Sequence, residues 1–414
     1  MRLLLLNGYG IRFNVEKARL YIKNGKSLEN INNEESKHLN NEESKHLNNE
    51  NIEYVFQPKR INIDNIVIYG RSGDISIEAI RWLIKHNVAI TILDWNGKLL
   101  TTMLPKESVQ VKTKFAQYAS FRDKKLRLEI AKEIIRGKVQ RSKAVLEWLK
   151  SRYPETNYDF SVEEQRLEEA KNIPELIRAE ARIAKQYWAE IVKIIPKKLE
   201  FGGRNTIDRP FGAGDFVNCM LNYGYAILEA ECLRAINASG LDVHVGFLHE
   251  MQLGKNSLAY DLQEPFRFLI DMAVISAIEK GKIENKDFIR TENYNLRLRS
   301  SGAKKLIEEI NLWFNKRVNF KGKLCTWSNV LITQTTDLAH YLVGDKSEIN
   351  FEKPFFEIER TDTEEIRRLI SEMPYTVWKK MGYSKGTLHP LKQKVKEGKA
   401  FNLSMQVKER LLEL

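Results

Sequence analysis

The stretch Ser257-Leu-Ala-Tyr-Asp-Leu-Gln-Glu-Pro-Phe-Arg-Phe-Leu-Ile-Asp271 places three acids in an apolar helical pattern. Asp261 and Glu264 are three residues apart, and Asp271 follows seven residues later, so all three are expected on one side of a helix that Pro265 kinks. Acids gathered on an apolar helix repel one another unless a cation collects them. Oxygen ligands suit magnesium or manganese. The stretch therefore predicts part of a metal site in a helical region.

A glutamate upstream is also expected to face inward. The predicted inward face of its helix carries Glu180 with Ile177, Ile183 and Tyr187. A carboxylate on an inward face must be paired, protonated or bound to metal. The alternative is a partly exposed glutamate that pairs with Arg182, Lys185 or another cation.

A histidine lies between these two segments. Gly240 is expected to cap the end of a helix, and the chain then runs through a loop into Gly246-Phe-Leu-His249. Imidazole is compatible with manganese, which makes His249 a candidate ligand. The alternative is a structural histidine, the usual role of a lone one.

Composition limits the class of protein. The 414 residues predict two or three domains, and 43% hydrophobic residues exclude a disordered chain. The 67 Lys and Arg against 55 Asp and Glu give a net charge of +12, which favours a polyanionic partner. A basic protein without a nucleic-acid role is the alternative.

The cysteines and apolar runs indicate the compartment. Cys219, Cys232 and Cys325 fit neither a disulfide framework nor a zinc spacing, which predicts reduced thiols. The sequence has no uninterrupted apolar run of about 18 residues, the length of a membrane span. We therefore expect a soluble protein of the cytoplasm.

The fold class predicted from these patterns is α+β. The expected strands are Leu3–Asn7, Ala18–Ile22, Ile61–Ile68 and Ala89–Leu93, with a helical insert at Ile75–Lys85. The expected later helices are Val111–Arg152, Pro174–Ile195, Asp215–Ala238, Ala259–Lys280 and Ala303–Val318. We predict a β-rich domain at 1–105, a helical domain at 106–345, a linker at 346–360 and a C-terminal domain at 361–414.

Two further stretches have unusual composition. The unit Asn33–Asn40 is repeated at once as Asn41–Asn48, and we expect a mobile loop at about 25–55 in which His38 and His46 hold no metal. Val111–Arg152 has thirteen Lys or Arg against four Asp or Glu. This excess predicts a basic helix face that contacts the DNA backbone, with an ordinary solvated face as the alternative.

The ordered motifs resemble the CRISPR-associated integrase family over roughly residues 1–320. The residues that carry the resemblance are Ile66–Gly70, Ile75-Ser76, Ile92–Lys98, Glu180 with Tyr187-Trp188, Asp215–Asn218, Gly246–His249 and Ser257–Arg267. Two departures are Ala181, where the family commonly has Gly, and Arg209-Pro-Phe-Gly212, where it often has paired prolines.

The resemblance implies a site and a chemistry. Glu180, His249 and Glu264 would be the ligands of Mg²⁺ or Mn²⁺, with Asp261 as a supporting acid and Asn218 as an active-site neighbour. A metal so held would activate a DNA 3′-hydroxyl and neutralise charge on the scissile phosphate. The resemblance also implies a homodimer formed through the β-rich domain, with higher assembly on double-stranded DNA.

The last part of the chain predicts a helix-turn-helix domain. Thr363–Met373 and Tyr375–Met381 are helical patterns, Gly382 marks a turn, and Ser384 is an expected N-cap of a basic third helix. The candidate DNA contacts are Lys385, Thr387, His389, Lys392 and Lys394. Pro390 should kink or end that helix. A small helical bundle for oligomerisation is the alternative.

An integrase core followed by such a domain resembles the casposases, the family members that mobilise casposon elements. An appended sequence reader suits a transposase, which must find its own terminal repeats. The runner-up is a CRISPR spacer-acquisition integrase. A non-catalytic DNA-binding protein and a metal-dependent nuclease without joining activity are the alternatives from other classes.

Overall fold

The computed structural model describes a defined part of the chain. The described residues are 2–25, 53–70, 72–94, 96–105, 110–153, 155–204, 213–290, 296–356, 358, 364–397, 401, 403, 407, 410 and 411. They form two compact units, Met1–Arg141 with Phe160–Pro354 and Ser142–Asp159 with Phe355–Leu414. The repeat at 33–48 with its two histidines, and the departure at 209–212, lie outside the described residues.

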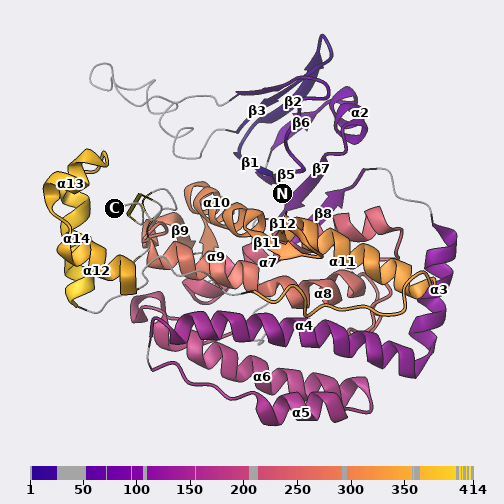
Figure 1. The fold of residues 1–414 in the computed structure, drawn as a ribbon. Coiled ribbons are helices and arrows are strands. Elements are labelled where there is room, and N and C mark those ends of the chain that lie inside the picture. Colours follow the sequence, from indigo (N-terminus) through magenta and orange to yellow (C-terminus); the bar gives the residue numbers. More distant parts are fainter. Residues whose placement is uncertain are drawn as a thin grey trace. The chain divides into compact units, whose positions relative to one another are not determined.

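The strands of the N-terminal region form two four-stranded sheets (Figure 1). One has the order β1 (Leu3–Gly8), β5 (Asn65–Gly70), β7 (Ala89–Leu93) and β8 (Leu99–Met103), antiparallel only between β7 and β8. The other has the order β4 (Glu53–Phe56), β3 (Arg19–Lys23), β2 (Ile11–Glu16) and β6 (Gly73–Ile75). Helix α2 (Ile77–Lys85) follows Ser76, whose hydroxyl accepts the Ala79 amide.

Apolar side chains from both sheets and α2 form one core. Leu6, Ile22, Ile66, Leu83 and Ile90 are among its buried members. In β2, Ile11 and Phe13 are buried while the residues between and after them are exposed, the alternation of a half-buried strand. The four expected strands are confirmed, whereas β2, β4, β6 and β8 were missed because they are short or interrupted by polar residues.

Helices make up most of the rest of the first unit. They are α3 (Val111–Arg122), the first part of α4 (Lys124–Lys150), α5 (Ser161–Glu169), α6 (Ile173–Ile194), α7 (Phe216–Ser239), α8 (Ser257–Gln263), α9 (Arg267–Glu279), α10 (Ser300–Asn315) and α11 (Trp327–Leu342). Short 3₁₀ turns are η1 (Lys197–Leu199), η2 (Glu264–Phe266) and η3 (Asn285–Asp287). Two small hairpins pair β9 (Phe288–Arg290) with β10 (Leu296–Leu298) and β11 (Arg317–Phe320) with β12 (Lys323–Thr326).

Helix α7 is the centre of this helical region. Most of its residues are buried, and α8, α9, α10 and α11 all contact it. It starts at Asp215, whose carboxylate accepts the Asn218 amide, and ends at Gly240 with a φ of +70°. The mixed α and β architecture, with strands first and helices after, is confirmed.

The helical, amphipathic character of the basic segment is confirmed, and contact of its cations with DNA stays a prediction. The segment is divided at Asp123, which separates α3 from α4 and accepts the first amides of α4. Several α4 cations face inward or are paired: Arg141 is fully buried, Arg136 binds Glu133 and Glu168, and Lys138 lies between two acids. The sequence pattern gave their helical spacing but not the acids that neighbouring elements bring to them.

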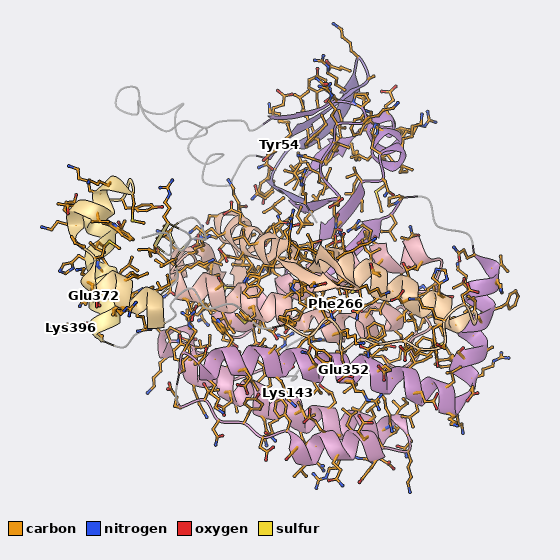
Figure 2. All side chains as sticks on the ribbon, viewed as in Figure 1. Tyr54, Lys143, Phe266, Glu352, Glu372 and Lys396 are labelled. Carbon is orange, nitrogen blue, oxygen red and sulfur yellow. The ribbon has the colours of Figure 1, made fainter. Side chains whose placement is uncertain are left out.

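The described part of the second unit includes three C-terminal helices. They are α12 (Glu364–Glu372), α13 (Tyr375–Lys380) and α14 (Lys385–Lys396), with Glu372 and Lys396 labelled in Figure 2. Ile366, Ile370, Trp378 and Leu388 form their buried core. Gly382 turns the chain with a φ of +89°, and Ser384 occupies the N-cap position of α14. Pro390 lies inside α14, so it did not end that helix.

Two general expectations concern the thiols and the membrane. All three cysteines are free, with Cys219 and Cys232 buried and Cys325 partly exposed. None of the helices in the described part of the chain is both long enough and apolar enough to cross a membrane.

Candidate active site

Two of the predicted ligands meet at one lysine. Glu180 lies in the middle of α6, and Glu264 begins the η2 turn where Pro265 interrupts the helical run. The ammonium of Lys138, from α4, donates to Glu180 Oε1 and lies 2.6 Å from Glu264 Oε2. Three elements far apart in sequence therefore bring two carboxylates to one cation.

A second cation supports Glu264. Arg267, one turn later at the start of α9, places Nη2 3.1 Å from Glu264 Oε1. Burial raises the pKa of the Glu264 carboxyl, but the charges of Arg267 and Lys138 outweigh it and lower that pKa to about 2. Burial lowers the pKa of Lys138, while Glu264 and Glu180 raise it above its ordinary value. Glu264 and both cations are therefore charged.

The helical faces were only partly as expected. Ile183 and Tyr187 are buried on the same side as Glu180, but Ile177 is exposed. Glu180 is partly exposed and pairs with another cation, Lys138, as the alternative expectation allowed, whereas Arg182 binds Glu163. Ala181 is exposed, so its methyl group changes no buried contact.

Asp261 organises the loop that carries the histidine. Its fully buried carboxylate accepts the amides of Phe247, Leu248 and His249, the last at 2.9 Å. A Cβ on Gly246 would lie 2.8 Å from Asp261 Oδ2, so glycine permits this close approach. The motif Gly246–His249 and the acid Asp261 therefore form one structural unit.

The same carboxylate orients the His249 ring. Asp261 Oδ1 lies 2.8 Å from His249 Nδ1, and with the proton on Nδ1 the other nitrogen keeps a lone pair for a ligand. Burial lowers the pKa of His249, but the hydrogen bond and charge of Asp261 outweigh it, so the pKa is raised. The side chain is 40% exposed, which leaves it accessible to a partner.

Asp271, the third acid of the stretch Ser257–Asp271, has partners other than Lys138 and His249. Asp271 accepts hydrogen bonds from Tyr187 at 2.8 Å and Tyr225 at 2.6 Å. Burial raises the pKa of Asp271 to about 6, although the two hydroxyl donors lower it. The three acids of this stretch therefore have different partners: the backbone of Phe247–His249 for Asp261, two cations for Glu264, and two tyrosines for Asp271.

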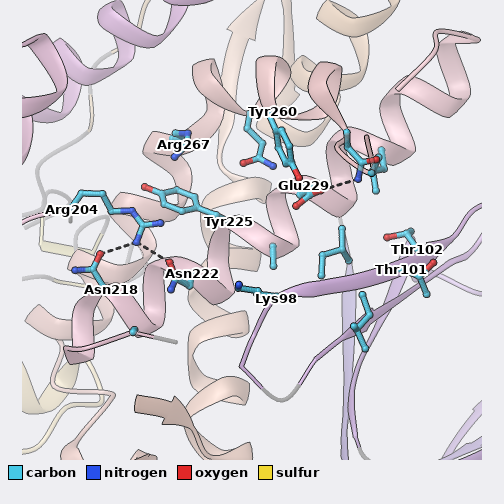
Figure 3. Close-up of a pocket in the computed structure, with 18 of the residues that line it drawn as sticks. Lys98, Thr101, Thr102, Arg204, Asn218, Asn222, Tyr225, Glu229, Tyr260 and Arg267 are labelled. Atoms are coloured by element: carbon cyan, nitrogen blue, oxygen red, sulfur yellow. Dashed lines mark hydrogen bonds between the residues drawn. The ribbon is translucent and has the colours of Figure 1, made fainter. Parts of the chain in front are cut away.

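A cavity of about 1160 Å³ adjoins the Glu264 turn (Figure 3). Asn218 lines it, held by Asp215 through its amide nitrogen and by Arg204 Nη1, which donates to Asn218 Oδ1 at 2.8 Å. Arg204 and Arg267 both lie over the ring of Tyr225. Two guanidinium groups therefore face a space large enough for a nucleotide.

The donor set fits a hard divalent cation. Glu264 Oε2 is buried, and its close partner is the Lys138 ammonium at 2.6 Å. Carboxylate oxygens with one imidazole suit Mg²⁺ or Mn²⁺. As they are placed, no three His, Cys, Asp or Glu side chains of the described ranges are close enough together to hold a metal. Two of the three predicted ligands, Glu180 and Glu264, lie close together, and the ammonium of Lys138 contacts both.

The five predicted C-terminal contacts differ in exposure. Lys385, His389 and Lys394 are exposed on α14. Thr387 accepts the indole proton of Trp378 at 3.0 Å, and Lys392 donates to the Ser371 carbonyl at 3.0 Å. Thr387 and Lys392 therefore also contribute to packing within the helical cluster.

Sequence reasoning missed the cations of the site. Lys138 is one of thirteen positive residues in its segment, and no local pattern distinguishes it. Arg267 stands three residues after Glu264, a spacing that favours an ion pair within one helical turn and that could have identified it.

Comparison with known proteins shows a consistent match. The family described as CRISPR associated protein Cas1 matches residues 12–311. CRISPR-associated endonuclease Cas1 1 of Archaeoglobus fulgidus is 28% identical over 366 residues, covering 83% of this chain and 97% of that protein. The structure of a casposase bound to integration product is 53% identical with a TM-score of 0.81, covering 91% of this chain and 100% of the other. A Cas1 protein from Thermotoga maritima shares the fold with a TM-score of 0.66.

Proposed function

The chain belongs to the Cas1 family, a family of enzymes that cleave and join DNA, and we propose that it acts as a casposase. In this role it joins the 3′-hydroxyl ends of a mobile element to target DNA by transesterification. The observation that carries the proposal is the 53% identity to a casposase across that protein's whole length. That structure contains an integration product, which is the product of the proposed reaction.

Glu180, His249 and Glu264 are the residues that would hold the divalent cation. Bound there, Mg²⁺ or Mn²⁺ supplies activation of the 3′-hydroxyl and neutralisation of charge on the scissile phosphate. Asp261 keeps the His249 ring oriented through Nδ1, at 2.8 Å. Arg267 keeps Glu264 ionised, so that its carboxylate remains an anionic ligand.

The cavity beside Glu264 suits the DNA end. Arg204 donates hydrogen bonds to the side-chain oxygens of Asn218 and Asn222, both at 2.8 Å. Both of these partners are neutral, so these two contacts do not neutralise the positive charge of Arg204. Burial lowers the pKa of the Arg204 guanidinium below its ordinary value, because a buried charge is less well solvated. A phosphate of the incoming strand would pair with this guanidinium group. Asn218 therefore acts by positioning Arg204.

The C-terminal helices would read the element's terminal repeat. Lys385, His389 and Lys394 project from α14, the helix after the Gly382 turn, and α12 to α14 have their own core. Exposed cations on one helix favour contact with DNA phosphates and bases. We also propose that the chain has the domain divisions expected from the sequence. In this function it would form a homodimer through the β-rich region and act on DNA in the cytoplasm.

A CRISPR spacer-acquisition integrase is the second candidate. The match to Cas1 endonucleases favours it, because the Archaeoglobus fulgidus protein is matched over 97% of its length. Such an integrase would depend on a partner subunit and on short prespacers, whereas a casposase recognises its own ends.

One experiment separates these functions. The protein is incubated with Mn²⁺, a short duplex carrying a candidate terminal repeat and a supercoiled plasmid, and the joined products are sequenced. We expect insertion without a partner protein and its loss in Glu264→Ala. Insertion at a CRISPR leader only after a partner subunit is added would favour the spacer integrase. Plasmid cutting without joining would leave a nuclease, and DNA binding unaffected by Glu264→Ala without any reaction would leave a binding protein.

A further inference from the structure

Lys138 occupies the space between the two carboxylates proposed as metal ligands. Its ammonium donates to Glu180 Oε1 and lies 2.6 Å from Glu264 Oε2. Its side chain is 20% exposed, and those of Glu180 and Glu264 are 17% and 6% exposed. The contact is therefore shielded from water, and salt and solvent screen such a buried ion pair only weakly.

The charges around this lysine balance without a metal. Glu180 and Glu264 contribute two negative charges, and Lys138 and Arg267 contribute two positive charges. Without a cation between them the two partly buried carboxylates would repel each other. The ammonium therefore offsets this repulsion and holds the two side chains close together.

A divalent cation at the same carboxylates cannot share this arrangement. Lys138 lies 2.6 Å from Glu264 Oε2, so its ammonium is the close cationic neighbour of that oxygen. A metal bound to the same two oxygens would repel the ammonium at contact distance. Arg267 already adds a positive charge on the other oxygen of Glu264.

We propose that Lys138 is an internal placeholder cation, which holds Glu180 and Glu264 in position and must be displaced when a divalent metal ion binds. The inference rests on the proposed function, because it takes these glutamates as metal ligands. Displacement lowers the apparent metal affinity, since only the fraction of molecules with the lysine withdrawn is competent to bind. The long side chain of Lys138 provides the reach for this movement.

The test measures Mn²⁺ binding directly by the electron paramagnetic resonance signal of free Mn²⁺, with no DNA present. In Lys138→Met we expect binding about tenfold tighter than in the wild type, as for a site that the ammonium fills about nine-tenths of the time. Lys138→Arg keeps the charge and should keep the weaker binding. Unchanged or weaker binding in Lys138→Met would overturn the proposal.

The matched control is Lys132→Met. Lys132 lies six residues earlier on α4 and donates to the Glu168 carbonyl, so the change removes the same charge from the same helix away from the two glutamates. Its binding constant should stay within about twofold of the wild type, since exposed charges at a distance are screened by salt. Equal tightening in both variants would overturn the displacement and leave only a change in net charge.

A measurement on the wild type decides the matter if Lys138→Met does not fold. Lysines are methylated with formaldehyde and a borane reductant, with and without Mn²⁺, and peptides are quantified by mass spectrometry. Mn²⁺ should increase methylation of Lys138 several-fold and leave Lys132 unchanged. Unchanged or reduced methylation of Lys138 would overturn the proposal.

Glu264→Gln separates the two levels of inference. Wild-type Mn²⁺ binding that is lost in Glu264→Gln supports the metal site. If that binding is present while Lys138 shows neither effect, the placeholder role alone fails. If the wild type binds no Mn²⁺ that depends on Glu264, the metal site fails and the placeholder role fails with it.

Discussion

Glu264 and Asp271 are buried acids seven residues apart whose surroundings differ in kind. Glu264 faces two cations, Lys138 and Arg267, whereas Asp271 accepts hydrogen bonds from two neutral phenols, Tyr187 and Tyr225. The pKa of Glu264 is lowered to about 2 and that of Asp271 is raised to about 6. Similar burial therefore gives opposite shifts, and the partners decide the sign.

The difference separates the proposed metal ligand from a structural acid. Glu264 remains charged at any physiological pH and has two close cations, Lys138 and Arg267. Asp271 is tied to Tyr187 of α6 and Tyr225 of α7, so its carboxyl joins three helices. The four predictions that follow test this distinction.

The largest expected effect is on Glu264. Glu264→Gln removes the charge of a proposed metal ligand and should lower the rate of strand transfer by about 10³-fold, the scale of losing a strong electrostatic contributor. Asp271→Asn keeps the size of its side chain and should lower that rate less than about tenfold. The measurement is joined product per minute with Mn²⁺ and a free 3′-hydroxyl donor. Similar losses in both variants would remove the distinction between the two acids.

The next effect is on the orientation of His249. Asp261→Asn places an amide group where a carboxylate accepts three backbone amides and the His249 ring, so donors would face donors. Mn²⁺ affinity should fall about 10- to 100-fold, as for other partners that orient a ligand. The measurement is a titration of free Mn²⁺ by electron paramagnetic resonance.

Asp242→Asn is the matched control for that change. Asp242 lies in the same loop and accepts the His244 amide at 2.9 Å, but it is not bonded to His249 in the described structure. Its Mn²⁺ affinity should stay within about twofold of the wild type, given the small net value of an exposed hydrogen bond. A greater loss than in Asp261→Asn would show that loop order, and not Asp261 itself, orients the histidine.

The third prediction concerns pH. The folded pKa of Asp271, about 6, exceeds the unfolded value of about 3.9, so its contribution to stability is complete below about pH 3.9 and is lost as pH rises through about 6. Glu264, with a folded pKa of about 2, contributes above about pH 4.3, and its contribution is lost as pH falls toward about 2. As pH rises, the contribution of Glu264 to the free energy of unfolding should therefore increase and that of Asp271 should decrease.

Urea unfolding of the wild type and Asp271→Asn measures the Asp271 part. The difference in free energy of unfolding, wild type minus variant, should decrease by about 1–3 kcal/mol between about pH 4 and about pH 7. A difference that stays constant over this range would mean that Asp271 is ionised throughout.

The smallest expected effect concerns a single hydroxyl group. Tyr187→Phe removes one donor to Asp271 and should lower the free energy of unfolding by about 1 kcal/mol, while strand transfer stays within about threefold. Urea unfolding and the joining assay measure the two quantities. Tyr118→Phe, which removes an exposed bond to Asp242, is the control and should cost less. A large loss of joining in Tyr187→Phe would place Asp271 in the catalytic machinery.

The sequence by itself determined the order of elements and the individual acids. Local spacing is enough for an amphipathic helix or a strand, so α2, α6, α7 and α10 were expected close to their observed bounds. The helix α11 was missed, as were the hairpins β9–β10 and β11–β12, because a short or mixed apolar pattern does not distinguish helix from strand. Glu180, His249, Glu264 and Asp261 were also selected from the sequence as candidate site residues, through the motifs and the resemblance they carry, and their roles stay predictions.

Only the tertiary structure decided which charges meet. It brought Lys138 to Glu180 and Glu264, residues 42 or more positions away in sequence, and it moved Asp271 to a separate pair of tyrosines. Spacing along a helix fixes the direction of a side chain but not the element that packs opposite it. Long-range packing therefore determines the partner of each buried acid, and with it the sign of the pKa shift and the capacity to bind a metal.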